Sequence, residues 1–164
     1  MKKILYIDMD NVIVDFKSGI MRLSQEVQDE FAGNLDDVPG IFSLMDPMPG
    51  AIESVQTLSQ HFDTYVLSTA PWSNPSAWSD KVEWIHRYFK NDETTALKDP
   101  LGNPLWKRLI LSHHKHLNQG DFLVDDRTAN GADRFNGEHI HFGHERWPDW
   151  ETILKYLLRH TTSS

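Results

Sequence analysis

Short apolar segments that end in polar or acidic residues constrain the fold of this chain more than any other feature. Four of them are predicted to be buried strands because of this pattern: 3–7, 64–67, 109–111 and 122–124. A fifth strand is predicted at residues 140–142. Helical patterns cover residues 16–30, 51–60, 76–89 and a last segment that opens at Pro148 and runs to about residue 160. Short strands that alternate with helices predict an α/β fold with a largely parallel sheet.

The apolar residues of segment 76–89 predict which face of that helix is buried. Spacings of three and four indicate one amphipathic stripe, made of Trp78, Val82, Ile85 and Phe89. Other tryptophans are predicted to pack in the core or to anchor the last helix: Trp84, Trp106, Trp147 and Trp150.

Three polar clusters follow predicted strands, at residues 8–10, 68–69 and 125–126. In parallel α/β sheets, ligands bind outside the carboxyl ends of the strands. The fold is therefore expected to bring these distant segments to one edge of the sheet.

The acidic members of these clusters are Asp8, Asp10, Asp125 and Asp126. An isolated pair such as Asp8 and Asp10 is more often an acidic turn than a site. Here a second pair ends another strand, and neighbouring carboxylates repel one another unless a cation lies between them. Carboxylate oxygens suit a hard divalent cation, so a Mg²⁺ site is predicted.

Thr69 and Lys115 supply the donors that a phosphate site requires. The Thr69 hydroxyl lies at a predicted strand end, and Lys115 precedes the strand that ends in Asp125. A carboxylate nucleophile, a cation, a hydroxyl and a lysine form a minimal set for phosphoryl transfer through an acyl-phosphate.

Several stretches of the chain resemble the haloacid dehalogenase superfamily. They are DMDNVIVDF at 8–16, LSTAP at 67–71, Lys115 and FLVDDR at 122–127. Within that superfamily the chain is similar to the 5′(3′)-deoxyribonucleotidases, and further matching stretches are DPMPGA at 46–51, KVEWIHRYF at 81–89 and ILSHHK at 110–115. The resemblance implies a Rossmannoid three-layer fold in a single phosphatase domain, residues 1–160. It also implies a small helical cap inserted after the first strand, at about residues 16–46, and a disordered tail is expected at residues 161–164.

The resemblance implies roles for the four carboxylates. Asp8 would be the nucleophile and a Mg²⁺ ligand. Asp10 would be the general acid and base, with its backbone carbonyl on the cation, and this role requires a raised pKa. Asp126 would bind the cation directly, and Asp125 would lie close behind it.

The remaining site residues are also assigned by resemblance. Thr69 and Lys115 would hold the phosphoryl oxygens, and Phe16 matches a position that contacts the base. Trp72, in the loop after Thr69, is a further candidate for substrate contact.

Two features depart from the family pattern. Asn11 stands where glycine is usual, and asparagine adopts left-handed backbone angles more easily than most residues. The cap insert is short, with Phe31 and Phe42 as candidate cap aromatics, so a more open site is expected.

Charge and composition exclude several classes of partner. A net charge of −8 argues against nucleic acid polymers and anionic membranes as partners. No apolar run approaches the roughly 18 residues that a membrane span requires. The absence of cysteine excludes thiolate chemistry and fits a reducing cytoplasm, which is the expected location. The sequence leaves the oligomeric state open.

The leading hypothesis is a phosphatase for (deoxy)nucleoside monophosphates. A phosphatase for another small metabolite, such as a sugar phosphate, is the first alternative. A signalling receiver domain is disfavoured by the order of its acidic residues. In a receiver domain an acidic pair follows the first strand and the phosphorylated aspartate follows a later one. Here Asp8 and Asp10 follow the first strand, and an adjacent acidic pair follows a later strand. A catalytically silent binding module is disfavoured because Asp8 and Asp10 are both present. Two histidine clusters, at 113–116 and 139–144, are interpreted as hydrogen-bonded or exposed residues rather than as a zinc site.

Overall fold

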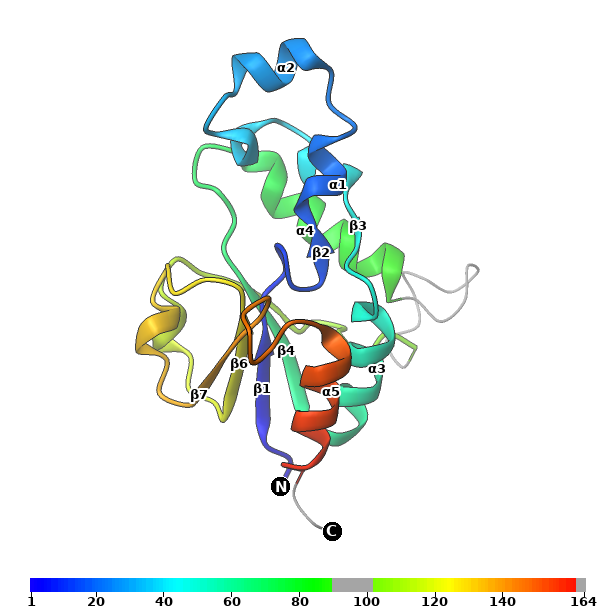
Figure 1. The fold of residues 1–164 in the computed structure, drawn as a ribbon, viewed down its shortest axis with the longest axis vertical. Coiled ribbons are helices and arrows are strands. Elements are labelled where there is room, and N and C mark those ends of the chain that lie inside the picture. The colour runs from blue at the N-terminus through cyan, green and yellow to red at the C-terminus, as the bar shows by residue number, and fades with distance from the viewer. Residues whose placement is uncertain (90–101, 162–164) are drawn as a thin grey trace.

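The structure is a computed structural model that describes residues 1–89 and 102–161. Its centre is a five-stranded sheet in which every pairing is parallel. The strands lie in the order β5 (Leu109–Leu111), β4 (Asp63–Ser68), β1 (Ile4–Ile7), β6 (Phe122–Asp125) and β7 (Glu138–His141). The predicted α/β fold with a parallel sheet is confirmed (Figure 1).

Helices α3 (Ala51–His61) and α5 (Trp150–Leu158) lie side by side against one face of the sheet (Figure 1). On the other face, a second apolar cluster is formed by Tyr6, Leu67, Leu123, Ala132 and Phe135. Its last two members come from the segment around the short helix η4 (Ala132–Arg134). The two layers cover the strands, which explains why the strands are nearly continuous apolar runs.

The insert after the first strand stands above the carboxyl ends of the sheet (Figure 1). A two-stranded antiparallel pair, β2 (Val14–Asp15) with β3 (Asp46–Pro47), joins its two ends. Between them lie four short helices: α1 (Phe16–Ile20), α2 (Gln25–Glu30), η1 (Leu35–Asp37) and η2 (Ile41–Leu44). This insert, residues 16–46, is called the cap below.

The single helix predicted at residues 16–30 is wrong, because the chain forms two helices there. Ser24 begins the second one, since its side chain accepts a hydrogen bond from the amide of Val27 at 3.3 Å. The first amides of a helix have no partner within that helix, and the serine side chain accepts one of them. Such a cap therefore starts a new helix at this position.

Helix α4 (Pro75–Tyr88) also differs from its prediction. Trp78 and Val82 are 36% and 39% exposed, while Lys81 and Trp84 are buried. Ile85 and Phe89 are buried as predicted, so the predicted face is partly correct, and the buried stripe is rotated from it toward Lys81 and Trp84. Apolar periodicity missed it because the stripe contains a lysine, which such a pattern assigns to the surface.

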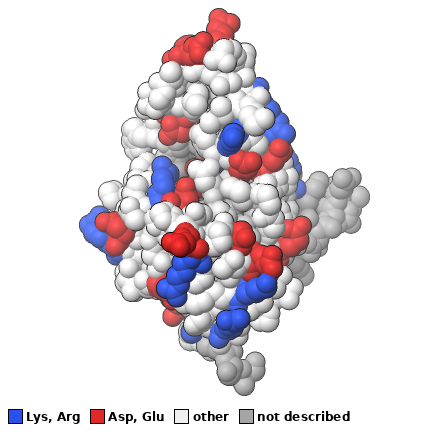
Figure 2. Space-filling view, viewed as in Figure 1, with Lys and Arg blue, Asp and Glu red and all other residues white. Residues whose placement is uncertain are grey.

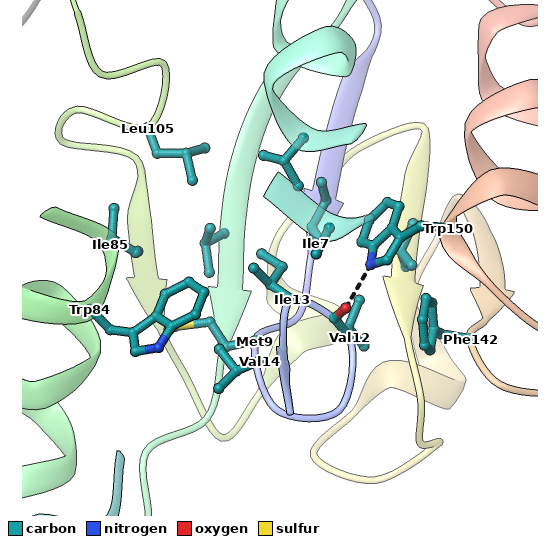
Figure 3. Close-up of a cluster of buried hydrophobic side chains, with 14 of the residues drawn as sticks. Ile7, Met9, Val12, Ile13, Val14, Trp84, Ile85, Leu105, Phe142 and Trp150 are labelled. Carbon is teal, nitrogen blue, oxygen red and sulfur yellow. Dashed lines mark hydrogen bonds between the residues drawn. The ribbon is translucent and has the colours of Figure 1, made fainter. Parts of the chain in front are cut away.

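Two tryptophans join distant segments to the core, as predicted. Trp150 donates its indole N–H to the carbonyl of Val12 at 2.7 Å, and Figure 3 shows this bond beside Phe142 and Ile7. Trp84 likewise donates to the carbonyl of Met45 at 2.9 Å. Both residues are 1% exposed, and truncating such a side chain to alanine typically costs about 3–5 kcal/mol of stability. The last helix begins after Pro148, at Trp150, because the Asp149 side chain caps it.

Charged side chains of both signs are interspersed on the face shown in Figure 2, and no continuous basic band crosses its described residues. Within residues 1–89 and 102–161, no helix is both long enough and apolar enough to span a bilayer. Of the expected tail, Thr161 is described and its hydroxyl donates to the carbonyl of Leu158 at 3.2 Å, while residues 162–164 lie outside the described part of the chain.

Candidate active site

A tight turn after β1 positions the first two carboxylates. The amide of Asp8 donates to the carbonyl of Val124 at 2.9 Å, which extends the pairing of β1 with β6 by one residue. The carbonyl of Met9 then accepts the amides of Val12, Ile13 and Val14 at 3.1, 2.9 and 2.9 Å. Asn11 has φ 59°, in the left-handed region, as predicted for an asparagine in place of glycine.

Three carboxylates meet at the carboxyl end of β1 and β6. Ile7 pairs with Val124, so Asp8 and Asp125 are neighbours across the two strands. Asp8, Asp125 and Asp126 each place one oxygen within 4.8 Å of the others. Strand β1 lies where the strand order reverses, which is the ligand-binding edge of a doubly wound sheet.

Lys115 lies among these carboxylates. Its ammonium is 3.0 Å from Oδ1 of Asp8 and 2.5 Å from Oδ2 of Asp125. The residue is buried at the start of helix η3 (Lys115–Leu117), where its amide donates to the carbonyl of Asn130. Burial lowers the pKa of this lysine, but the two neighbouring carboxylates raise it, and the net direction is upward.

The electrostatics of the three carboxylates favour an additional cation. Burial, followed by the negative charge of Asp8, raises the pKa of Asp125 to about 7, although Lys115 opposes this shift. The same two causes raise the pKa of Asp126. Asp8 and Asp125 share one lysine while Asp126 lies beside them, so the negative charge of the three carboxylates is under-compensated, and a bound divalent cation would offset it.

The hydrogen-bond partners of the individual carboxylate oxygens show whether a Mg²⁺ ion fits here. Oδ2 of Asp8 and Oδ1 of Asp126 are buried, and neither has a hydrogen-bond partner in the described part of the chain. Both oxygens of Asp125 are engaged, one by Lys115 and the other by the amide of Arg127 at 2.9 Å. Two unpartnered, buried carboxylate oxygens suit a hard cation, so Asp8 and Asp126 would fit as ligands of Mg²⁺.

Asp10 faces a lysine that the sequence analysis did not identify. Lys81 of helix α4 lies 2.8 and 2.9 Å from the two carboxylate oxygens of Asp10 and 3.2 Å from Oγ of Ser68. Burial, opposed by Lys81 and reinforced by the charge of Asp8, raises the pKa of Asp10. That direction is the one a general acid requires. The sequence does contain one indication of this contact. Lys81 lies at helical spacing from Ala77 and Trp84, so the three share one face of α4, and that face is the buried one.

A cavity of about 530 Å³ lies between the cap and this edge of the sheet. Its wall contains four cap residues and seven residues of the loops at the sheet edge: Phe16, Gly33, Leu35, Asp36, Asp10, Asn11, Thr69, Pro71, His113, Arg127 and Asn130. A volume of this size suits a small molecule. Arg127, which the sequence analysis gave no role, provides a cation on the wall.

The predicted aromatic contacts are only partly in this wall. Phe16 lines the cavity and packs edge-on against Phe42, with ring centroids 5.9 Å apart. Phe42 is buried behind it, and neither Phe42 nor Phe31 is among the lining residues. Trp72 is 81% exposed and is not among the lining residues, although its ring centroid lies 6.1 Å from that of His113.

Thr69 lines the cavity, with its hydroxyl donating to the carbonyl of Ser112 at 2.7 Å. Of the histidines, His139 and His141 stack at 5.2 Å, and Nε2 of His141 lies 2.8 Å from the carbonyl oxygen of Asp126. In residues 1–89 and 102–161, the one group of three potential metal-ligating side chains is Asp8, Asp125 and Asp126.

A parallel sheet with acidic strand ends at the reversal of strand order, and with a helical cap after the first strand, defines a phosphatase of the haloacid dehalogenase type. The model of the family described as 5′ nucleotidase, deoxy (Pyrimidine), cytosolic type C protein matches residues 34–153. The chain therefore belongs to this family of phosphoric monoester hydrolases.

Individual relatives agree with this assignment. A protein of Vibrio phage KVP40 with the provisional name 5′(3′)-deoxyribonucleotidase is 53% identical over 156 residues, 95% of this chain and 85% of that protein. A Staphylococcus epidermidis protein with the same provisional name is 28% identical over 181 residues, covering 92% and 93% of the two chains. The human 5′(3′)-deoxyribonucleotidase, cytosolic type, is 25% identical over 178 residues, covering 90% and 77%.

Proposed function

We propose that the protein is a magnesium-dependent phosphomonoesterase that hydrolyses (deoxy)nucleoside monophosphates through an aspartyl-phosphate. The observation that carries this proposal is the meeting of Asp8, Asp125 and Asp126, the first two paired with Lys115, with unpartnered oxygens on Asp8 and Asp126, beside a cavity of small-molecule size.

Asp8 is the proposed nucleophile. Lys115 holds one of its oxygens, and the other, which has no partner in the described part of the chain, would bind the cation, so the carboxylate is fixed in its orientation. Its attack forms an oxygen–phosphorus bond as the ester oxygen leaves phosphorus. Lys115 holds the phosphoryl oxygens together with Thr69, whose single hydroxyl proton would turn from the carbonyl of Ser112 to the phosphate.

Asp10 is the proposed general acid and base. It gives its proton to the leaving oxygen in the first step, and it then takes a proton from the water that attacks the aspartyl-phosphate. That second step releases inorganic phosphate and restores Asp8. When bound by Asp8, Asp126 and the carbonyl of Asp10, with Asp125 behind them, Mg²⁺ supplies positive charge that stabilises the transferring phosphoryl group.

A nucleoside monophosphate suits the rest of the cavity. Phe16 and Leu35 present apolar side chains on the cap side, while Arg127 and Thr69 lie on the side of the sheet edge. Stacking of a base on an aromatic ring contributes about 1–3 kcal/mol. The names of the phage, bacterial and human relatives support the same substrate class, and that of the human protein supports a cytoplasmic location.

A substrate panel assayed with and without metal tests the proposal. Deoxynucleoside and nucleoside monophosphates are expected to be hydrolysed faster than sugar phosphates. Excess chelator should lower the rate by about 100-fold or more, because several kcal/mol of charge stabilisation are lost, and added Mg²⁺ should restore it. Phosphate release is the measurement. Full activity in chelator would contradict the metal assignment, and sugar phosphates that outperform every nucleotide would contradict the substrate class.

The two adjacent aspartates should differ in their effect on metal binding. Asp126→Ala removes an unpartnered oxygen, whereas Asp125→Ala removes oxygens already engaged by Lys115 and Arg127. We therefore expect Asp125→Ala to weaken Mg²⁺ binding by about 10–100-fold, as for groups behind a ligand, and Asp126→Ala to weaken it more. Calorimetric titration measures both, with Glu151→Ala, which changes an exposed side chain of α5, as the control. The reverse ranking would show that Asp125 is the direct ligand.

A further inference from the structure

Lys81 is a buried cation that forms an ion pair with Asp10. The residue is 0% exposed, and its ammonium reaches both oxygens of Asp10 and the hydroxyl of Ser68. An ammonium has three N–H donors, so these three acceptors use its full capacity. Burial of a charge is unfavourable unless it is paired, and an apolar side chain would fill the same volume without that cost. The ion pair with Asp10 is thus the reason for a lysine at this position.

The orientation of the Asp10 carboxylate depends in turn on Lys81. In the described part of the chain, Lys81 is the only side chain that hydrogen-bonds to the carboxylate of Asp10. Asp10 lies on the turn after β1 and lines the cavity, so a side chain without this contact could rotate about its own bonds. Because both oxygens are held at once, the carboxylate plane has a single orientation.

The other side of Lys81 faces the cap. Its ammonium lies 4.3 Å from the centre of the Phe42 ring, within the range of a cation–π contact. Phe42 in turn packs against Phe16, which lines the cavity. Lys81 is therefore enclosed between the turn that carries Asp10 and the cap, without being a lining residue of the cavity itself.

We propose that Lys81 is a positioning residue, which holds the Asp10 carboxylate in the orientation from which it exchanges a proton first with the leaving oxygen and then with the attacking water. Lys81 acts through Asp10 and contacts neither the substrate nor the metal. This inference rests on the proposed function, because it assigns Lys81 a part in that same reaction.

Leaving-group dependence separates positioning from packing. In Lys81→Met, kcat/KM for a nucleoside monophosphate should fall by about 30-fold, because its alcohol leaves poorly without a proton and general acid catalysis contributes about 100-fold or more. For p-nitrophenyl phosphate the loss should be less than about 3-fold, since its phenolate needs little protonation. Lys155→Met, which removes an exposed lysine of α5, is the control and should change neither value.

A double mutant identifies the residue through which Lys81 acts. In an Asp10→Asn background, Lys81→Met should cost no further activity, because groups that act as one unit are not additive. Thermal melting of each variant shows whether it folds. If Lys81→Met does not fold, Lys81→Gln, whose side-chain amide keeps two N–H donors, takes its place. It is judged by the same dependence on the leaving group and by the same non-additivity with Asp10→Asn.

Equal losses on both substrates, together with losses that add to that of Asp10→Asn, would overturn the inference and make Lys81 a packing residue. A wild-type protein that hydrolyses neither substrate would instead contradict the proposed function. The two failures are therefore distinguishable.

Discussion

Asp8→Asn is expected to abolish turnover, with kcat reduced by roughly 10⁴-fold or more, as for the loss of other catalytic nucleophiles. An amide is a poor nucleophile, and it is a weaker ligand for a hard cation than a carboxylate. The substitution keeps the volume of a side chain that is only 2% exposed, and Lys115 retains its contact with Asp125, so the variant should still fold. Steady-state hydrolysis of a deoxynucleoside monophosphate measures the loss.

A matched control for Asp8→Asn is available at Asp149. This residue caps helix α5, where its side chain accepts the amide of Thr152 at 2.8 Å. Asparagine caps helices about as well as aspartate, so Asp149→Asn should leave both stability and activity unchanged. Near-normal turnover in Asp8→Asn would exclude the covalent mechanism, because no other described carboxylate combines the contact with Lys115 and an unpartnered oxygen.

Asp10→Asn is expected to slow both chemical steps, by about 100-fold or more with a nucleotide substrate. The effect should depend on the substrate in a characteristic way. With p-nitrophenyl phosphate the first step needs little protonation, whereas hydrolysis of the aspartyl-phosphate still lacks its base. Rapid mixing should therefore show a burst of p-nitrophenolate, up to one equivalent of enzyme, followed by slow turnover.

The burst also provides the control for Asp10→Asn. The Asp8→Asn variant, which lacks the nucleophile, should show no burst with the same substrate. An Asp10→Asn variant with no burst and equal losses on both substrates would mean that Asp10 does not transfer the proton. The raised pKa of Asp10, caused by burial and by the charge of Asp8, would then reflect its surroundings alone.

Much of the sheet was predictable from local sequence. Strand β5 has the predicted bounds, and β1, β4 and β6 differ from theirs by one or two residues. These strands are short apolar runs closed by polar residues, and burial on both faces produces that pattern directly. The helix predicted at 16–30 failed because a capping interaction of one residue, Ser24, interrupts an otherwise continuous helical pattern.

Local sequence also determined where the carboxylates would meet. Asp8 follows β1 and Asp125 ends β6, and parallel strands necessarily place their carboxyl ends at one edge. The left-handed backbone of Asn11 was predictable for the same kind of reason, because residue type limits the local backbone angles. The proposed catalytic centre thus depends on features that each segment carries by itself.

Only the tertiary structure decided which partner each carboxylate has. Lys81 and Asp10 are 71 positions apart, and Lys115 reaches Asp8 and Asp125 from the separate helix η3. Apolar periodicity did not identify Lys81 as buried, because it records the polarity of a residue and not the charge that the fold places opposite it. Pairing of this kind arises from the packing of helix α4 beneath the cap, so it follows from long-range geometry that no local pattern encodes.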